Sequence, residues 1–161
     1  VAVLAHALGV IRRDIFRKPC DVNALATAAL YHDASEILTG DLPTPIKYHN
    51  AEIMSAYHAV EDLAVQKLLG MLPPELRATY ADVLDEDKDG DIYPLVKAAD
   101  KLSAYIKCIE ERKAGNNEFL SAEAQTRAAL DASPLPEVHY FLEHFIPAFE
   151  RDLDELGAIG Q

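Results

Sequence analysis

Apolar residues recur along the chain at spacings of three and four, which is the pattern of amphipathic helices. No segment alternates apolar and polar residues over the length of a strand. Helices are expected over 1–12, 22–38, a stretch that begins after Asn50, 73–80, 93–114, 116–132 and 137–156, with a bend in the last one at Pro147. The residues at helical spacing in the stretch after Asn50 are Ile53, Tyr57, Val60, Ala64 and Leu68. The sequence therefore predicts an all-α fold of about six or seven helices with no sheet, and an acidic loop at 85–91.

Residues suited to helix ends lie between these segments. Asp21 and Asn50 are expected to cap the N-termini of the helices that follow them, because their side chains can accept hydrogen bonds from the first amides. Asn116 or Asn117 is expected to do the same for the helix that ends at 132. Gly40 and Gly115 suit left-handed ends, and the proline-containing segment 41–45 cannot be helical.

Composition narrows the class of protein. The chain has 161 residues, of which 50% are apolar and 26% charged, as in one globular domain spanning 1–161. The net charge of −12 argues against a nucleic-acid polymer as partner, since such binding needs a basic face. No apolar run is long enough to cross a membrane.

Two further observations concern the cellular location of the protein and the start of its sequence. Cys20 and Cys108 are far apart and form no paired motif, which favours a reducing, cytoplasmic location. The apolar stretch 1–9 reads as the middle of a helix with no cap and no initiator Met, so we expect the sequence to begin inside a longer protein.

The most informative stretch lies in the expected helix 22–38. On a helical wheel Leu25, Ala29, His32 and Glu36 fall on one core-facing seam, with Asp33 beside them. Burying such charge is costly unless the groups are paired or bind a metal ion. A self-satisfied hydrogen bond between His32 and Glu36 and a metal site completed by other helices are both compatible with this spacing.

The expected helix 93–114 has its own core seam. Leu95, Ala99, Leu102 and Ile106 lie along it, whereas Asp100 lies on the flank. Periodicity alone therefore predicts that Asp100 is a surface residue.

His32-Asp33, followed far downstream by Asp100, resembles the metal-binding pattern of HD-domain phosphohydrolases. The run 32–48, together with 107–111 and 114–120, resembles the 5′-deoxynucleotidase branch of that superfamily. The resemblance implies an all-α HD-domain bundle, a homodimer, and hydrolysis of 2′-deoxynucleoside 5′-monophosphates to deoxynucleoside and phosphate. It also implies one divalent metal ion (Co, Mn, Zn, Fe or Mg) that activates the attacking water.

The resemblance assigns roles to particular residues. His32, Asp33 and Asp100 match metal ligands, and Glu36 and Asp41 are the expected catalytic residues, with Glu36 as acid and base. The expected substrate contacts are Asp33, Asp41, Leu42, Pro43, Thr44 and Asp100. A further histidine ligand and an Arg-Trp pair of the family have no match, so the N-terminal part of the family domain is expected to precede this sequence.

Two alternatives remain at this point. One is another HD-superfamily phosphohydrolase that acts on a different nucleotide or phosphoester. The other is a non-catalytic helical binding protein that keeps the fold with a degenerate HD site. Substrate profiling separates the other phosphohydrolase from the 5′-deoxynucleotidase. A Glu-His-Ser stretch and an Arg-Trp pair upstream of this sequence would argue against the non-catalytic binding protein.

Overall fold

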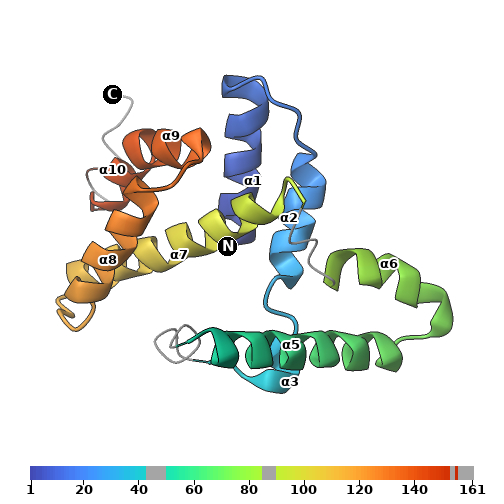
Figure 1. Cartoon of the computed structure of the whole chain (residues 1–161). Coiled ribbons are helices and arrows are strands. Elements are labelled where there is room, and N and C mark those ends of the chain that lie inside the picture. Colours follow the sequence, from blue (N-terminus) through green and yellow to red (C-terminus); the bar gives the residue numbers. More distant parts are fainter. Residues whose placement is uncertain (43–49, 85–89, 153–154, 156–161) are drawn as a thin grey trace. The chain divides into compact units, whose positions relative to one another are not determined.

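The structure, a computed structural model, describes residues 1–42, 50–84, 90–152 and 155 (Figure 1). Every regular element among them is helical, which confirms the all-α prediction. Seven of the described helices have nine residues or more, in agreement with the expected number. They are α1 (Ala2–Val10), α2 (Val22–Tyr31), α5 (Ala51–Met71), α6 (Pro74–Leu84), α7 (Tyr93–Lys113), α8 (Leu120–Asp131) and α9 (Pro136–His144).

The chain divides into two compact units, which are described separately. The first contains Val1–Ala26 and Gly90–Gln161, and the second contains Thr27–Asp89. Helix α2 contributes its first half to one unit and its second half to the other. The single domain expected from composition stays a prediction.

Helix α7 forms the core of the first unit and packs against α1 and α8 (Figure 1). The four residues of its predicted seam are all buried, with exposed fractions of 8% or less; they are Leu95, Ala99, Leu102 and Ile106. Asp100 is exposed on the flank, as the periodicity predicts. Gly115 follows the helix with a φ of +88°, which confirms its expected left-handed conformation.

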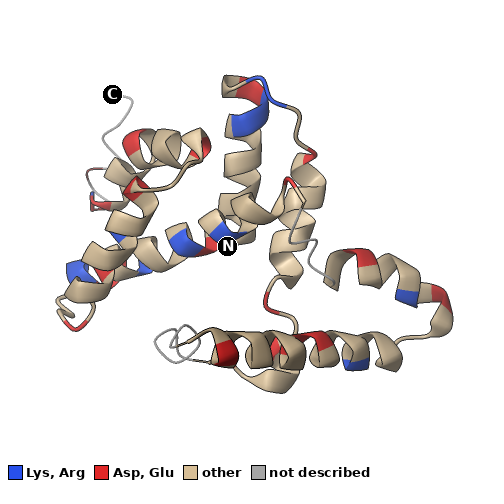
Figure 2. Ribbon diagram, in the orientation of Figure 1, with Lys and Arg blue, Asp and Glu red and all other residues tan. Residues whose placement is uncertain are grey.

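Helix α1 carries no Lys, Arg, Asp or Glu, and the first charged residues follow it in the π-helical turn η1 (Ile11–Ile15) (Figure 2). Gly9 brings α1 close to the first turn of α2. A Cβ atom at Gly9 would lie 2.9 Å from Leu25 Cδ2 and 3.3 Å from Val22 Cγ1. The close contact between these helices therefore depends on the absence of a side chain at this position.

One ion pair joins η1 to α9 inside the first unit. The Arg12 Nε donates to Glu137 Oε1 at 2.7 Å, and Glu137 is fully buried. The Arg12 Nη1 also donates to the carbonyl of Asp91 at 3.2 Å, just before α7. Glu137 Oε2 has no hydrogen-bond partner within the described part of the chain. The pair therefore holds a carboxylate in the core with only one of its oxygens satisfied.

The expected helix 137–156 is wrong in its length, and the bend expected at Pro147 is a break between two helices. Helix α9 ends at His144, and a short helix α10 (Ile146–Phe149) follows after Phe145. Pro147 explains the break, because it has no amide hydrogen to donate back to residue 143 and its ring crowds that turn. A proline is tolerated at the start of a new helix, where α10 places it.

The expected cap of the helix ending at 132 is also wrong. Helix α8 begins at Leu120, later than an Asn116 or Asn117 cap would require. The Asn116 side chain instead accepts from the amide of Glu118 at 3.1 Å and donates to Glu111 Oε2 at 2.9 Å. Asn116 thus closes the loop after α7 rather than starting α8.

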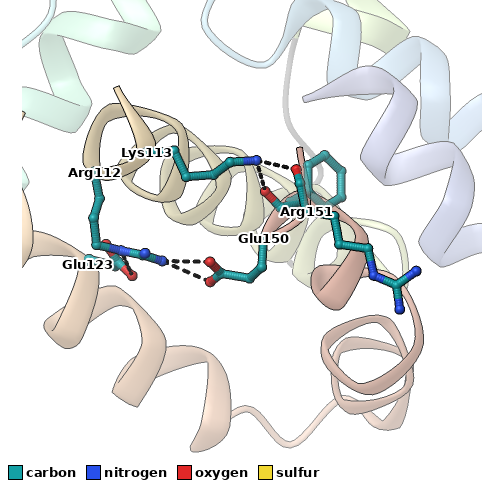
Figure 3. A network of polar contacts seen from close by, with 6 residues as sticks. Arg112, Lys113, Glu123, Glu150 and Arg151 are labelled. Carbon is teal, nitrogen blue, oxygen red and sulfur yellow. Dashed lines mark hydrogen bonds and ion pairs between the residues drawn. The ribbon is translucent and has the colours of Figure 1, made fainter. Parts of the chain in front are cut away.

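A network of charged groups fastens the C-terminal segment to the end of α7 (Figure 3). The Arg112 guanidinium donates to the carboxylates of Glu123 on α8 and Glu150 after α10, at 3.0 and 2.8 Å. These two carboxylates raise the pKa of Arg112 above its usual value. The Lys113 ammonium donates to the carbonyls of Phe149 and Arg151. Adjacent residues of α7 therefore hold both α8 and the end of α10.

In the second unit the short helix α3 (Glu36–Thr39) packs against α5, and α5 packs against α6. The Asn50 side chain accepts from the amide of Ile53 at 2.8 Å, which confirms the predicted cap of α5. Val60, one of the residues at helical spacing in this helix, is 48% exposed. The Arg77 guanidinium donates to the carbonyls of Leu72 and Gly70, so α6 closes the end of α5.

Candidate active site

Helix α2, which leads into the candidate site, is capped at its N-terminus and buried along one face. Asp21 Oδ1 accepts from the amides of Asn23 and Ala24, at 3.0 Å each, which confirms the predicted N-cap. Leu25 and Ala29 are buried, with exposed fractions of 0% and 3%. These contacts set the position from which the chain enters the His32-Asp33 segment.

The continuous helix expected over 22–38 is wrong, because α2 ends at Tyr31 and a turn over 32–35 separates it from α3. In this turn the amide of Ala34 donates to the carbonyl of Tyr31 at 2.8 Å, and the amide of Glu36 donates to the carbonyl of Asp33 at 3.0 Å. Asp and Ser are weak helix formers, since their side chains compete for backbone groups. His32 and Glu36 therefore do not share one straight helical face.

The His32 ring is held by its own helix. Its side chain is only 8% exposed, and Nδ1 lies 2.9 Å from the carbonyl oxygen of Ala29. A carbonyl can only accept, so this contact places a hydrogen on Nδ1. The other ring nitrogen, Nε2, lies 2.9 Å from Asp33 Oδ2, and the Asp33 side chain is 55% exposed. The turn thus brings an imidazole nitrogen and a carboxylate oxygen within 2.9 Å of each other.

These two atoms fit a divalent cation. With the hydrogen on Nδ1, a neutral His32 presents a lone pair at Nε2 to a negatively charged oxygen of Asp33. A proton or a cation at that point removes the repulsion. Imidazole and carboxylate together are a donor set for Zn, Mn, Fe or Co, and a carbonyl on the far nitrogen is the usual support of a histidine ligand. His32 and Asp33 therefore have the chemistry that a metal site requires.

The segment after α3 carries the next predicted site residues. Gly40 ends α3 with φ and ψ of 70° and 162°, a region open almost only to glycine. Gly40 ends the helix as expected, but its ψ of 162° lies outside the left-handed helical region, so the left-handed form of the cap is wrong. Asp41 is exposed and Leu42 is half-buried. Pro43 and Thr44 lie outside the described residues.

The structure groups His32, Asp33, Glu36 and Asp41 in the second unit, and Asp100 belongs to the first. Within either unit, the described residues bring no three His, Cys, Asp or Glu side chains into a metal-binding group. The inclusion of Asp100 in one site with His32 and Asp33 therefore stays a prediction. So do the catalytic roles of Glu36 and Asp41.

One contact near these residues was not expected from the sequence. The hydroxyl of Tyr57, on α5, donates to the carbonyl of Gly40 at 3.3 Å. The sequence indicates only that Tyr57 is one of the residues at helical spacing in this helix. Nothing in its spacing indicated which backbone group it meets, because the turn over 32–35 changes the course of the chain before Gly40.

Comparisons with known proteins identify relatives of this chain. The family model described as 5′-deoxynucleotidase YfbR-like matches residues 1–149. A 5′-deoxynucleotidase YfbR from Shigella flexneri is 50% identical over 158 residues, which are 98% of this chain and 79% of the relative. The corresponding protein from Escherichia coli strain ATCC 8739 is 49% identical over the same shares of both chains.

A solved structure gives the same result for the fold. The crystal structure of an HD-domain phosphohydrolase from Listeria innocua has a TM-score of 0.78 and 25% sequence identity. The similarity covers 92% of this chain and 72% of that one. With a family match over nearly its full length, this chain belongs to the YfbR-like 5′-deoxynucleotidase family of HD-domain proteins.

Proposed function

We propose that this protein hydrolyses 2′-deoxynucleoside 5′-monophosphates to deoxynucleoside and phosphate. The observation that carries the proposal is the 50% identity to a 5′-deoxynucleotidase over 98% of the chain. The geometry of the second unit supports it, because His32 Nε2 and Asp33 Oδ2 converge at 2.9 Å. No described helix is both long and apolar enough to cross a membrane.

The proposed metal ligands are His32, Asp33 and Asp100, the set that the resemblance to the family implies. The hydrogen on Nδ1 of His32 stays with the carbonyl of Ala29, so Nε2 is the ligating atom. A divalent ion held by these residues supplies Lewis-acid activation of water and neutralises charge on the phosphate. The identity of the ion is open among Co, Mn, Zn, Fe and Mg, since a nitrogen and oxygen donor set accepts several metals.

Glu36 is the proposed acid and base. Its backbone amide donates to the carbonyl of Asp33, so the turn that carries the ligand pair also fixes the start of α3 at Glu36. The Glu36 carboxylate accepts a proton from the attacking water as the new oxygen–phosphorus bond forms. The bond from phosphorus to the 5′-oxygen breaks, and the same proton passes to that oxygen.

Asp41 is the second proposed catalytic residue and a substrate contact. It follows Gly40 and is exposed, so its carboxylate is accessible to a bound nucleotide. As a hydrogen-bond acceptor it suits the sugar hydroxyl of the substrate and the hydrogen of the leaving 5′-hydroxyl. Asp33, Leu42, Pro43, Thr44 and Asp100 complete the proposed set of substrate contacts.

The first test is phosphate release from deoxy-AMP and AMP by the full-length protein. Co, Mn, Zn, Fe and Mg are supplied separately, and a chelated sample is the control. We expect release only with metal and faster release from the deoxynucleotide. Equal rates on both nucleotides would favour another HD-superfamily phosphohydrolase with a different substrate. Metal binding without phosphate release from either nucleotide would favour the same alternative. If the protein neither releases phosphate nor binds metal, the result favours a non-catalytic binding protein.

The second test separates the roles of the residues. Glu36→Gln is expected to abolish turnover while calorimetry still detects metal and nucleotide binding, whereas His32→Ala and Asp100→Ala are expected to weaken metal binding itself. Glu75→Gln is the matched control, because Glu75 is an exposed glutamate in the first turn of α6. Unchanged metal affinity in Asp100→Ala would remove that residue from the ligand set.

A homodimer and a cytoplasmic location complete the proposal. The resemblance to the family supports the dimer, and the free thiols of Cys20 and Cys108 are consistent with a reducing compartment. Light scattering coupled to size-exclusion chromatography tests the dimer directly. A mass of one chain at micromolar concentration would contradict it.

A further inference from the structure

The carbonyl of Gly40 is held from two directions. The Thr39 hydroxyl lies 3.0 Å from this oxygen, and the Tyr57 hydroxyl donates to it at 3.3 Å from a position seventeen residues later. The Gly40 amide in turn donates to the carbonyl of Glu36 at 2.9 Å. Both backbone groups of this glycine therefore have partners.

The hydrogen bonds to the Gly40 carbonyl affect the position of Asp41. Gly40 has no Cβ atom, so local sterics leave its backbone dihedrals broadly free. The carbonyl of Gly40 and the amide of Asp41 belong to one planar peptide unit. A hydrogen bond that fixes the direction of the carbonyl therefore fixes the plane from which Asp41 extends.

Tyr57 is suited to this task because its own position is well defined. Helix α5 begins at a capped N-terminus, where Asn50 accepts from Ile53, and α5 packs against α3. Tyr57 is half-buried two turns into this helix. Its hydroxyl thus links a rigid element to a glycine whose own conformation is weakly restrained.

We propose that Tyr57 is a positioning residue for Asp41 in the reaction, an inference that rests on the proposed function. Tyr57 does not touch the substrate. It orients the Gly40–Asp41 peptide so that the Asp41 carboxylate meets the bound nucleotide. Without the hydroxyl, the peptide plane rotates more freely and Asp41 spends less time in the productive orientation.

The test is a double-mutant cycle with Tyr57→Phe and Asp41→Asn, followed by kcat/KM for deoxy-AMP. Loss of one neutral hydrogen bond is expected to lower kcat/KM about fivefold to tenfold in Tyr57→Phe. In the Asp41→Asn background the same change is expected to lower it by less than about twofold, because the residue it positions is already impaired. The same fold-loss in both backgrounds would overturn the proposal.

A second readout does not depend on catalysis. Hydrogen–deuterium exchange of the peptide containing Gly40, Asp41 and Leu42 is expected to accelerate in Tyr57→Phe. Tyr80→Phe is the matched control, since it removes a hydroxyl from the same unit while keeping the ring that packs edge to face on Tyr31. Unchanged exchange in Tyr57→Phe would contradict the inference. A wild-type protein that releases no phosphate would refute the proposed function alone, because the exchange measurement still tests Tyr57.

Discussion

Removing the charge of Arg12 is expected to destabilise the first unit strongly. Glu137 is fully buried, and its Oε1 lies 2.7 Å from Arg12 Nε, which is itself mostly covered. At that distance the gross attraction is about 6 kcal/mol for an effective dielectric constant of ~20. The cost of removing both charges from water is of similar size, so the pair contributes little net stability. Arg12→Met removes the attraction and leaves the buried carboxylate uncompensated.

The expected loss in Arg12→Met is about 3–5 kcal/mol in the free energy of unfolding, as for other broken buried pairs. With a urea m-value of about 2 kcal/mol/M, the midpoint should fall by about 1.5–2.5 M. Urea unfolding followed by circular dichroism measures this shift. The double variant Arg12→Met/Glu137→Leu should recover most of it, because an apolar pair of similar volume has no desolvation cost.

Arg13→Met is the matched control for this experiment. Arg13 is the neighbouring arginine and pairs with Asp14, but both side chains are about half exposed. Its replacement is expected to leave the urea midpoint unchanged. The reasoning fails if Arg12→Met also leaves the midpoint unchanged, or if Arg12→Met and the double variant unfold at the same urea concentration.

Three further predictions concern single positions. Gly9→Ala should cost about 1–2 kcal/mol net in thermal unfolding, because overpacking against Leu25 and Val22 outweighs the better helix propensity of alanine; an unchanged Tm would contradict it. Gly40→Ala should cost about 1–3 kcal/mol of backbone strain at a φ of +70°, measured by urea unfolding, and a stabilised variant would refute this. Burial raises the pKa of Cys108, so the folded thiol holds its proton more tightly and Tm should fall as pH rises through the thiol range. A Cys108→Ala variant should show a smaller fall, and an equal fall in both would exclude this cause.

Much of the fold could be predicted because local chemistry decides it. Asp21 and Asn50 both cap helices as expected, because their side-chain oxygens accept hydrogen bonds from the first amides of the helix, which have no partner within the helix. The core seam of α7 was also predictable, because its residues recur at helical spacing and are buried. The exposure of Asp100 follows from the same periodicity.

The parts that could not be predicted depend on contacts between distant segments. Asp33 and Ser35 are weak helix formers, but they did not show that α2 would stop at Tyr31, because the backbone bonds of the turn over 32–35 differ only slightly from helical ones. The contact of Tyr57 with Gly40 follows from that turn and was missed with it. The donor chemistry of His32 and Asp33 follows from their residue types, but the positions of their side chains came only from the structure. Their role as metal ligands stays a prediction.

The network of charged groups at the end of α7 has a practical consequence for truncating this protein. The match to the family model ends at residue 149, so that boundary alone would suggest a safe place to truncate. A chain cut there would lose the carboxylate of Glu150 and the carbonyl of Arg151, and both are acceptors for the last cations of α7 (Figure 3). Two residues beyond the boundary of the family model are therefore part of the folded body.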